Sequence, residues 1–280
     1  VIADGFLANI LVDSQRNETI DRDAVQDVFS RLRRSVRSGP TGGMTEDEVH
    51  DLKDYLSRSF PSDFRIMDLL RLGFWDDAAE LAPRLPAGQR WEIFQFLWGC
   101  HPSVTEIFNR LTNGLDQVNH CRFVATDLKS FVPKSANAVP QTIIDVRVVA
   151  GLALEADLLP RVNLVTATGQ TVSLARSVAT ALVKEVIFFI PPEVVDDPNL
   201  SFFRHGDVLD FPGARSPKQI FSTWLAKDHP DFVLSMKEIF VRGKVSFLFR
   251  TYDEQYRFTT LMICQRDSNI EVNQTCALPI

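Results

Sequence analysis

Apolar residues recur at helical spacing through most of the first 118 residues, between stretches of charge. Thr45 is followed three residues later by Glu48, and Ser103 by Glu106. A hydroxyl residue followed three positions later by glutamate is typical of a capping box, in which each side chain binds the other's backbone N–H. We therefore predict a helical region over residues 1–118, with helices starting after Thr45 and Ser103.

One part of this region, RWEIFQFLWG, is apolar almost all round from Ile93 to Trp98. A helix with no polar face is usually buried inside a protein, although a partner surface or a membrane contact would give the same pattern. We interpret it as a helix of the core.

The pattern changes at about residue 119. HCRFVA, TIIDVRVV and VNLVTA are apolar and rich in β-branched residues, which is typical of strands, and VNLVTA runs into a turn at Thr168-Gly169. LARSVATALVKEVIFFI then shows helical spacing and ends at Pro191-Pro192. A strand ending in DVLD, helices near 217–226 and 231–242, and a strand TTLMIC complete the prediction.

Alternating strands and helices of this kind indicate an α/β layer with a mainly parallel sheet. We expect a partial P-loop NTPase-like domain over residues 119–272, with residues 1–118 as a helical insertion or arm. The chain starts at valine, and its last residues, QTCALPI, read like a translated sequencing adapter. We interpret residues 273–280 as a non-native tail and the chain as a fragment of a larger protein.

Composition narrows the class of protein. The chain has 280 residues, of which 45% are hydrophobic, and a net charge of -6, which gives no case for nucleic-acid binding. No apolar run reaches the ~20 residues that a membrane-spanning helix needs. Four cysteines are consistent with reduced thiols. We expect a cytoplasmic protein without a transmembrane segment.

The main candidate for chemistry is HGDVLDFPGARSP, where an apolar run ends in Asp210 and meets Pro212-Gly213. Ligands of open α/β sheets bind beyond the carboxyl ends of the strands, where Asp210 would lie. Its carboxylate could hold Mg²⁺, while the Gly213 amide reaches a terminal phosphate. The alternative is that these residues only form a turn at the end of a strand.

Three other patterns fit chemistry less well. Asp207 and Asp210 are three apart, so on a strand they face opposite sides about 10 Å apart along it. SGPTGGM lacks the spacing and the lysine of a phosphate loop. The pairs Cys100-His101 and His120-Cys121 are adjacent residues whose side chains diverge, whereas zinc ligands are usually two to four residues apart.

The segment DRDAVQDVFSRLRRSVRS carries aspartates early and arginines late. Charges in this order stabilise a helix through its dipole. The same arginines could instead form an anion-binding cluster. The sequence favours the first interpretation and leaves the second open.

The Asp-Phe-Pro-Gly pattern resembles the third GTPase motif in its dynamin-type form. TIIDVRVV, ATALVKEV, DVLDFPGARS and RGKVSFLFRTY before LMIC resemble segments of the putative bacterial virulence factor family, the SrfC-like proteins. The likeness covers roughly residues 90–272. It implies a larger protein with an upstream phosphate loop that this chain does not contain, and Mg²⁺ with GTP or ATP as ligands.

The resemblance also assigns roles to residues. It implies a metal role for Asp210, a γ-phosphate role for Gly213, and a nucleotide-binding switch segment made of Asp210, Phe211, Pro212, Gly213, Ala214 and Arg215. One departure is Pro217, where the family pattern has a second basic residue.

Two functions follow from the resemblance. The first is a dynamin-like protein that binds and hydrolyses GTP or ATP. The alternative is a non-catalytic pseudo-GTPase that acts as a structural or interaction protein. The expected partners are a nucleotide, with other proteins or further copies of the chain as additional partners.

Overall fold

The computed structural model describes residues 20–36, 39–60, 64–127, 129, 131, 145–154, 160–186, 193, 196, 198, 204, 220–255 and 257. The chain divides into two compact units. The first contains Val1–Leu182 and Pro217–Phe247, and the second contains Val183–Ser216 and Leu248–Ile280.

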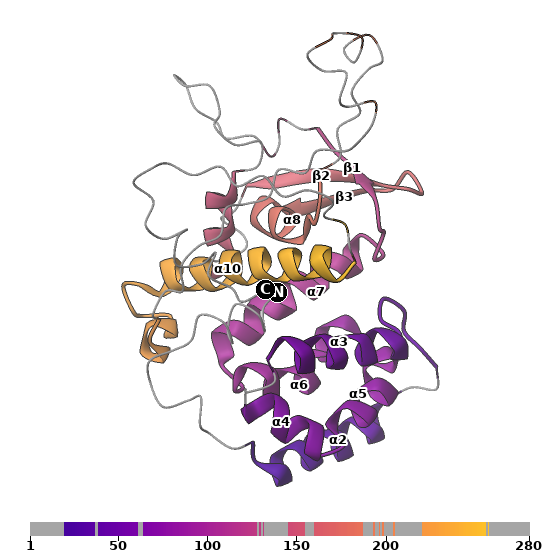
Figure 1. The fold of residues 1–280 in the computed structure, drawn as a ribbon, viewed down its shortest axis with the longest axis vertical. Coiled ribbons are helices and arrows are strands. Elements are labelled where there is room, and N and C mark those ends of the chain that lie inside the picture. Colours follow the sequence, from indigo (N-terminus) through magenta and orange to yellow (C-terminus); the bar gives the residue numbers. More distant parts are fainter. Residues whose placement is uncertain are drawn as a thin grey trace. The chain divides into compact units, whose positions relative to one another are not determined.

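Helices dominate the described residues (Figure 1). The N-terminal part contains α2 (Arg22–Ser35), α3 (Glu46–Ser59), α4 (Phe64–Arg71), α5 (Phe74–Leu81), α6 (Trp91–Phe94) and α7 (Pro102–Gln117), with 3₁₀ turns η2 (Ala82–Arg84), η3 (Ala87–Gln89) and η4 (Gln95–Trp98). The later part contains β1 (Val124–Ala125), η6 (Val146–Ala153), β2 (Arg161–Thr166), β3 (Thr171–Ala175), α8 (Arg176–Leu182), η9 (Ser222–Leu225) and α10 (Phe232–Glu254).

Side-chain caps start the first two described helices. The Asp21 carboxylate accepts hydrogen bonds from the backbone N–H groups of Asp23 and Ala24 at the start of α2. At α3 the predicted capping box is confirmed, because Thr45 and Glu48 each accept the other's backbone N–H. The second predicted capping box is wrong. Helix α7 begins at Pro102, and the Ser103 hydroxyl lies inside it and donates to the Leu225 carbonyl at 2.9 Å.

Aromatic side chains form the core of the N-terminal helices. The Phe74 ring contacts Phe29, Trp75 and Phe96 in edge-on geometry, with centroid distances of 5.5, 5.2 and 6.2 Å. Burying rings of this size supplies most of the apolar area that holds short helices together. The segment RWEIFQFLWG forms α6 and η4, and its apolar side chains from Ile93 to Trp98 are buried. The interpretation of this segment as core is therefore confirmed.

The sheet contradicts the predicted fold class. Its order is β1-β2-β3, and both pairs of strands are antiparallel. The described residues contain no parallel pair of strands, so the mainly parallel, P-loop NTPase-like α/β fold was a wrong prediction. The reason is local: Thr168-Gly169 reverses the chain directly, so VNLVTA pairs with the next residues in a hairpin instead of leading into a crossover helix.

Two neighbouring predictions, the strand TIIDVRVV and the helix over 174–190, are also wrong in part. In TIIDVRVV, Val146 to Val149 belong to the 3₁₀ helix η6, whose first turn is capped by Asp145 accepting from the Arg147 N–H. The long helix predicted over 174–190 starts only at Arg176, because Leu174 and Ala175 belong to β3, and α8 ends at Leu182.

The C-terminal predictions have mixed outcomes. In the range 217–226, where a helix was predicted, the described residues, from 220 on, contain the single 3₁₀ turn η9. The helix predicted over 231–242 is confirmed and extends to Glu254 as α10. The strand at Asp210 and the strand TTLMIC lie outside the described residues.

Helix α8 packs closely against α7 at Gly114. A Cβ atom added to Gly114 would lie 2.7 Å from Val178 Cγ1 and 3.2 Å from Leu182 Cδ1. Real Cβ atoms do not approach a neighbour within 2.7 Å, and Val178 cannot turn away easily because its side chain is branched at Cβ. Glycine at this position therefore sets the distance between the two helices.

We expect Gly114→Ala to lower the free energy of unfolding by about 1 kcal/mol, because overpacking costs more than the gain in helix propensity. Unfolding in urea of the single variants, and of Gly114→Ala with Val178→Ala, measures the coupling between the two sites. The double variant should lose less stability than the sum of the single losses. A Gly114→Ala variant more stable than the parent would contradict this packing.

Candidate functional site

The residues that the sequence assigns to nucleotide binding lie outside the described residues. This applies to all of 210–215, and also to His205 and Asp207. The metal role of Asp210 and the phosphate role of Gly213 stay predictions, and the site below is built from other residues.

Arg31 and Arg33 of α2 pair with carboxylates of neighbouring helices, whereas Arg34 Nε donates to the Ser30 carbonyl within α2. Arg31 Nη1 lies 2.6 Å from Glu92 Oε2, and Arg33 pairs with Asp77 and, at 3.6 Å, with Glu80. The pairs of Arg33 are exposed and contribute little stability, whereas the Glu92 side chain is only 12% exposed. Together the pairs join α2 to α5 and α6. Their partners favour a structural role for these arginines over an anion-binding one.

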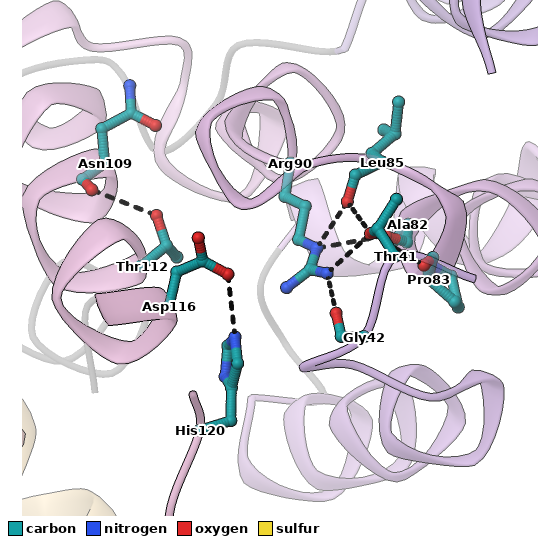
Figure 2. Close-up of polar contacts among 10 residues, drawn as sticks. All are labelled: Thr41, Gly42, Ala82, Pro83, Leu85, Arg90, Asn109, Thr112, Asp116 and His120. Atoms are coloured by element: carbon teal, nitrogen blue, oxygen red, sulfur yellow. Dashed lines mark hydrogen bonds and ion pairs between the residues drawn. The ribbon is translucent and has the colours of Figure 1, made fainter. Parts of the chain in front are cut away.

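Arg90 holds the glycine-containing loop that follows α2 (Figure 2). Its side chain is only 2% exposed. Nε donates to the carbonyls of Ala82 and Leu85, both at 3.2 Å, and Nη2 donates to the Gly42 carbonyl. Thr41 reinforces this contact, because its hydroxyl donates to the Leu85 carbonyl at 2.7 Å.

These carbonyl groups replace the water that the guanidinium loses on burial. Burial lowers the pKa of Arg90, whereas the carboxylates of Asp116 and Glu48 act in the opposite direction. The carbonyl of Gly42 and the hydroxyl of Thr41 thus fix this loop to Arg90 and η2. The sequence does not support the loop as a phosphate loop.

His120, which follows α7, pairs with Asp116 (Figure 2) and lies against Gly43 of the same loop. Its Nε2 lies 3.6 Å from Asp116 Oδ1, one turn earlier on the chain. A Cβ atom added to Gly43 would lie 2.0 Å from Nε2, and Gly43 has a φ of +75°. Only glycine fits this position, both for its backbone conformation and for the imidazole beside it.

The Cys-His pairs do not assemble into a metal site in the part of the chain that the structure describes. That part contains no group of three or more His, Cys, Asp or Glu side chains able to share a metal ion. His120 faces Asp116 and the Gly43 loop, and burial lowers the pKa of His101.

In the second unit, the phenol of Tyr252 is enclosed by charged groups. Its hydroxyl donates to Glu185 Oε1, which also accepts from Arg257 Nη1 at 2.9 Å. The Arg257 guanidinium and the Lys184 ammonium lie 4.4 and 5.6 Å from the Tyr252 ring centroid. Burial, and then the Glu185 carboxylate, raise the pKa of Tyr252 to about 12, and the Tyr252 hydrogen bond lowers that of Glu185. The cluster ties residues near 185 to the end of α10.

Lys244 of α10 meets the end of α8 in the first unit. Its ammonium group donates to the carbonyls of Thr180 and Ala181 at 3.2 and 2.7 Å. The last carbonyls of a helix have no partner within it and carry partial negative charge, so a cation there satisfies both needs. Burial nevertheless disfavours the charged amine and lowers the pKa of Lys244 to about 8.

The feature best suited to binding is the edge of β2 that faces β1. Thr166 N–H bonds to the Gln170 carbonyl, and Arg176 N–H to the Pro160 carbonyl, so the even-numbered residues of β2 direct their backbone groups to β3. By alternation, Arg161, Asn163 and Val165 direct theirs to the opposite edge.

Strand β1 covers only one end of this edge. It pairs Ala125 with Val165 and Val124 with Thr166, and there the strand ends. The Thr126 hydroxyl then donates to the Asn163 carbonyl at 2.8 Å. Among the described residues, nothing pairs with the N–H of Asn163 or with the N–H and C=O of Arg161 on this side.

An open depression of about 560 Å³ runs along the uncovered part of the edge. It is lined by residues 125–127, 161–163 and Val165. Val162, only 5% exposed, reaches the depression from the buried face of the sheet. On the exposed face of the sheet, Val165 is 39% exposed. The depression therefore combines open backbone groups with apolar side chains.

A signal for this site was present in the sequence. Polar and apolar residues alternate in 161–164 and again in 171–174, on either side of a turn centred on Thr168-Gly169. Strict alternation on both sides of a short turn indicates a hairpin. The helical spacing of 174–190 instead favoured a strand followed by a crossover helix, so the hairpin was not predicted.

The pKa of Lys244 makes stability depend on pH. The folded-state value of about 8 lies below the ordinary 10.5, so between these values the unfolded chain binds more protons and stability rises with pH. Relative to Lys244→Met, the parent should gain about 3 kcal/mol of unfolding free energy between pH 8 and pH 10.5.

Urea unfolding at several pH values measures this difference. Lys227→Met, at a lysine 66% exposed, shows whether loss of any lysine gives the same slope. A constant difference between the parent and Lys244→Met across this range would contradict the assignment.

The described residues contain no helix with the length and apolarity needed to cross a membrane.

Of three comparisons with known proteins, one found a match. The family model described as putative bacterial virulence factor matches residues 1–278. A search of curated proteins and a search of solved structures gave no match. The family match covers nearly the whole chain and confirms the resemblance at the level of the family. The chain belongs to the putative bacterial virulence factor family.

Proposed function

We propose that this chain is an interaction protein that binds an extended segment of a partner protein by strand addition at the edge of β2. The observation that carries the proposal is the direction of the backbone groups of Arg161 and Asn163, which face a side of β2 that β1 leaves uncovered. This belongs to the interaction class of function that the sequence left open.

Unpaired strand edges attract other strands, because backbone N–H and C=O groups gain by pairing. An incoming segment could form three hydrogen bonds here, to Asn163 N–H and to both groups of Arg161. Each contributes about 0.5–1.5 kcal/mol net, so these bonds alone give weak binding, and side chains in the depression must supply the rest.

The outer edge of β3 is a poorer candidate. Arg161 reaches across the sheet, where its Nε donates to the Ser173 hydroxyl at 3.1 Å and its Nη2 donates to the Ser173 carbonyl. A side chain therefore already occupies the acceptor at the middle of that edge. The depression, by contrast, follows β2.

A second function is supported by the sequence alone. The pattern Asp210-Phe211-Pro212-Gly213, followed by Ala214-Arg215, resembles a Mg²⁺- and phosphate-binding segment of GTPases. We propose on this basis that the complete protein binds GTP, or ATP, with Asp210 facing the metal ion.

Replacement of single amides tests strand addition. The probe is the acetylated and amidated peptide Lys-Thr-Val-Thr-Val-Thr-Lys, followed through the backbone amide signals of ¹⁵N-labelled protein. We expect shifts at Ala125, Arg161 and Asn163. In Asn163→Pro, which removes an N–H that the β2–β3 ladder does not use, the shifts at Ala125 and Arg161 should be lost.

Ser173→Pro is the matched control, because the same alternation directs the Ser173 N–H to the outer edge of β3. This variant should bind the peptide like the parent. Binding that survives Asn163→Pro, or that is lost only in Ser173→Pro, would place the peptide elsewhere and overturn the proposal.

The nucleotide proposal is tested in the complete protein. Asp210→Ala should abolish Mg²⁺-dependent GTP hydrolysis while circular dichroism and the unfolding midpoint stay unchanged, since the carboxylate is expected to act through the metal ion. Asp207→Ala is the control and should retain turnover. Equal turnover in Asp210→Ala and the parent would reject the metal role of Asp210.

A further inference from the structure

We infer that the bound segment runs antiparallel to β2, places an apolar side chain opposite Val162 between two polar ones, and brings a positive charge close to Asp127. This inference rests on the proposed strand addition and names the kind of segment that the edge accepts.

The direction follows from β1. This strand is antiparallel to β2, and its pairs, Val124 with Thr166 and Ala125 with Val165, set a register that the next positions would continue. A segment that runs the same way as β1 extends this ladder, with its first residue opposite Asn163 and its third opposite Arg161. A parallel segment would need slanted hydrogen bonds, which are less stable per residue.

The side-chain pattern follows from alternation across the strand pair. Residues directly opposite each other in an antiparallel pair have side chains on the same face of the sheet. The first and third residues of the segment would share the exposed face with Asn163 and Arg161, so they should be polar. The second would share the buried face with Val162, whose side chain lines the depression, so it should be apolar.

The positive charge expected in the bound segment follows from the position of Asp127. This residue lies two positions after the end of β1 and lines the depression, where the first residue of an antiparallel segment would enter. One of its carboxylate oxygens accepts the Lys129 N–H at 3.0 Å. A lysine, an arginine or a free N-terminus in the segment would face this carboxylate, whereas a parallel segment would bring its C-terminal end there.

Spin labels distinguish the two directions. The probe is the peptide Lys-Thr-Val-Thr-Gly-Gly with a nitroxide at its N-terminal or its C-terminal end, added to ¹⁵N-labelled protein. The antiparallel direction predicts that the N-terminal label broadens the amide signals of Thr126 and Asp127. The C-terminal label should instead broaden those of Arg161 and Val162. The reverse assignment would overturn the inferred direction.

Two substitutions test the pattern. Aspartate in place of the peptide valine should reduce affinity at least tenfold, because a carboxylate would enter the buried face. Glutamate in place of the peptide lysine should reduce it about threefold, and Asp127→Lys should reverse that preference. Affinities are measured from the same amide shifts.

The outcomes distinguish failure of the inferred segment pattern from failure of strand addition itself. Peptide shifts at Asn163 with no dependence on the valine or on charge would reject the inferred pattern and keep strand addition. Absence of any shift at Arg161 and Asn163, with both peptides, would reject strand addition itself.

Discussion

The register between β2 and β3 is the constraint on which the proposed binding edge depends. Because Val165 pairs with Thr171 and Arg161 with Ala175, each even-numbered residue of β2 turns its backbone groups to β3 and each odd-numbered one turns them away. A shift of one residue would exchange these roles and would also turn Val162 and Leu164 from the core to solvent. The burial of these two side chains therefore fixes which amides are open.

The helices around the sheet act as a support for this hairpin. Aromatic contacts around Phe74 hold the short N-terminal helices together, and Arg90 fixes the glycine-containing loop to η2 with hydrogen bonds to carbonyls. Gly114 allows α7 to approach α8, which directly follows β3, so a closely packed contact links the N-terminal helices to the sheet. A binding edge on a rigid support loses less entropy on binding than one on a mobile loop.

The sequence predicted well those features that depend on neighbouring residues. Examples are the capping box of Thr45 and Glu48, the burial of RWEIFQFLWG and the helix after Asp231. Each follows from a pattern of neighbouring residues and does not depend on a contact with a distant part of the chain. The fold class was wrong because the apolar, β-branched character of VNLVTA predicts a strand without giving the direction of its partner. VNLVTA reads as a strand either way, and only its pairing with Thr171 to Ala175 makes the sheet antiparallel.

The candidate site could be predicted only in part, for a related reason. Alternation of polar and apolar residues in 161–164 and 171–174 could have indicated the hairpin. No sequence pattern shows that β1 stops at Ala125, or that the Thr126 hydroxyl donates to the Asn163 carbonyl. The family match places the chain among putative bacterial virulence factors, and it gives no chemistry for any residue. The roles of 210–215 remain predictions, since those residues lie outside the described part.

Amide hydrogen exchange along β2 tests the central claim most directly. The N–H groups of Val162 and Leu164 bond to β3 and should exchange slowly, whereas those of Arg161 and Asn163 should exchange at rates close to those of an unstructured chain. Slow exchange at Asn163, comparable to that at Leu164, would show that the edge is already covered in the free protein and would contradict the account.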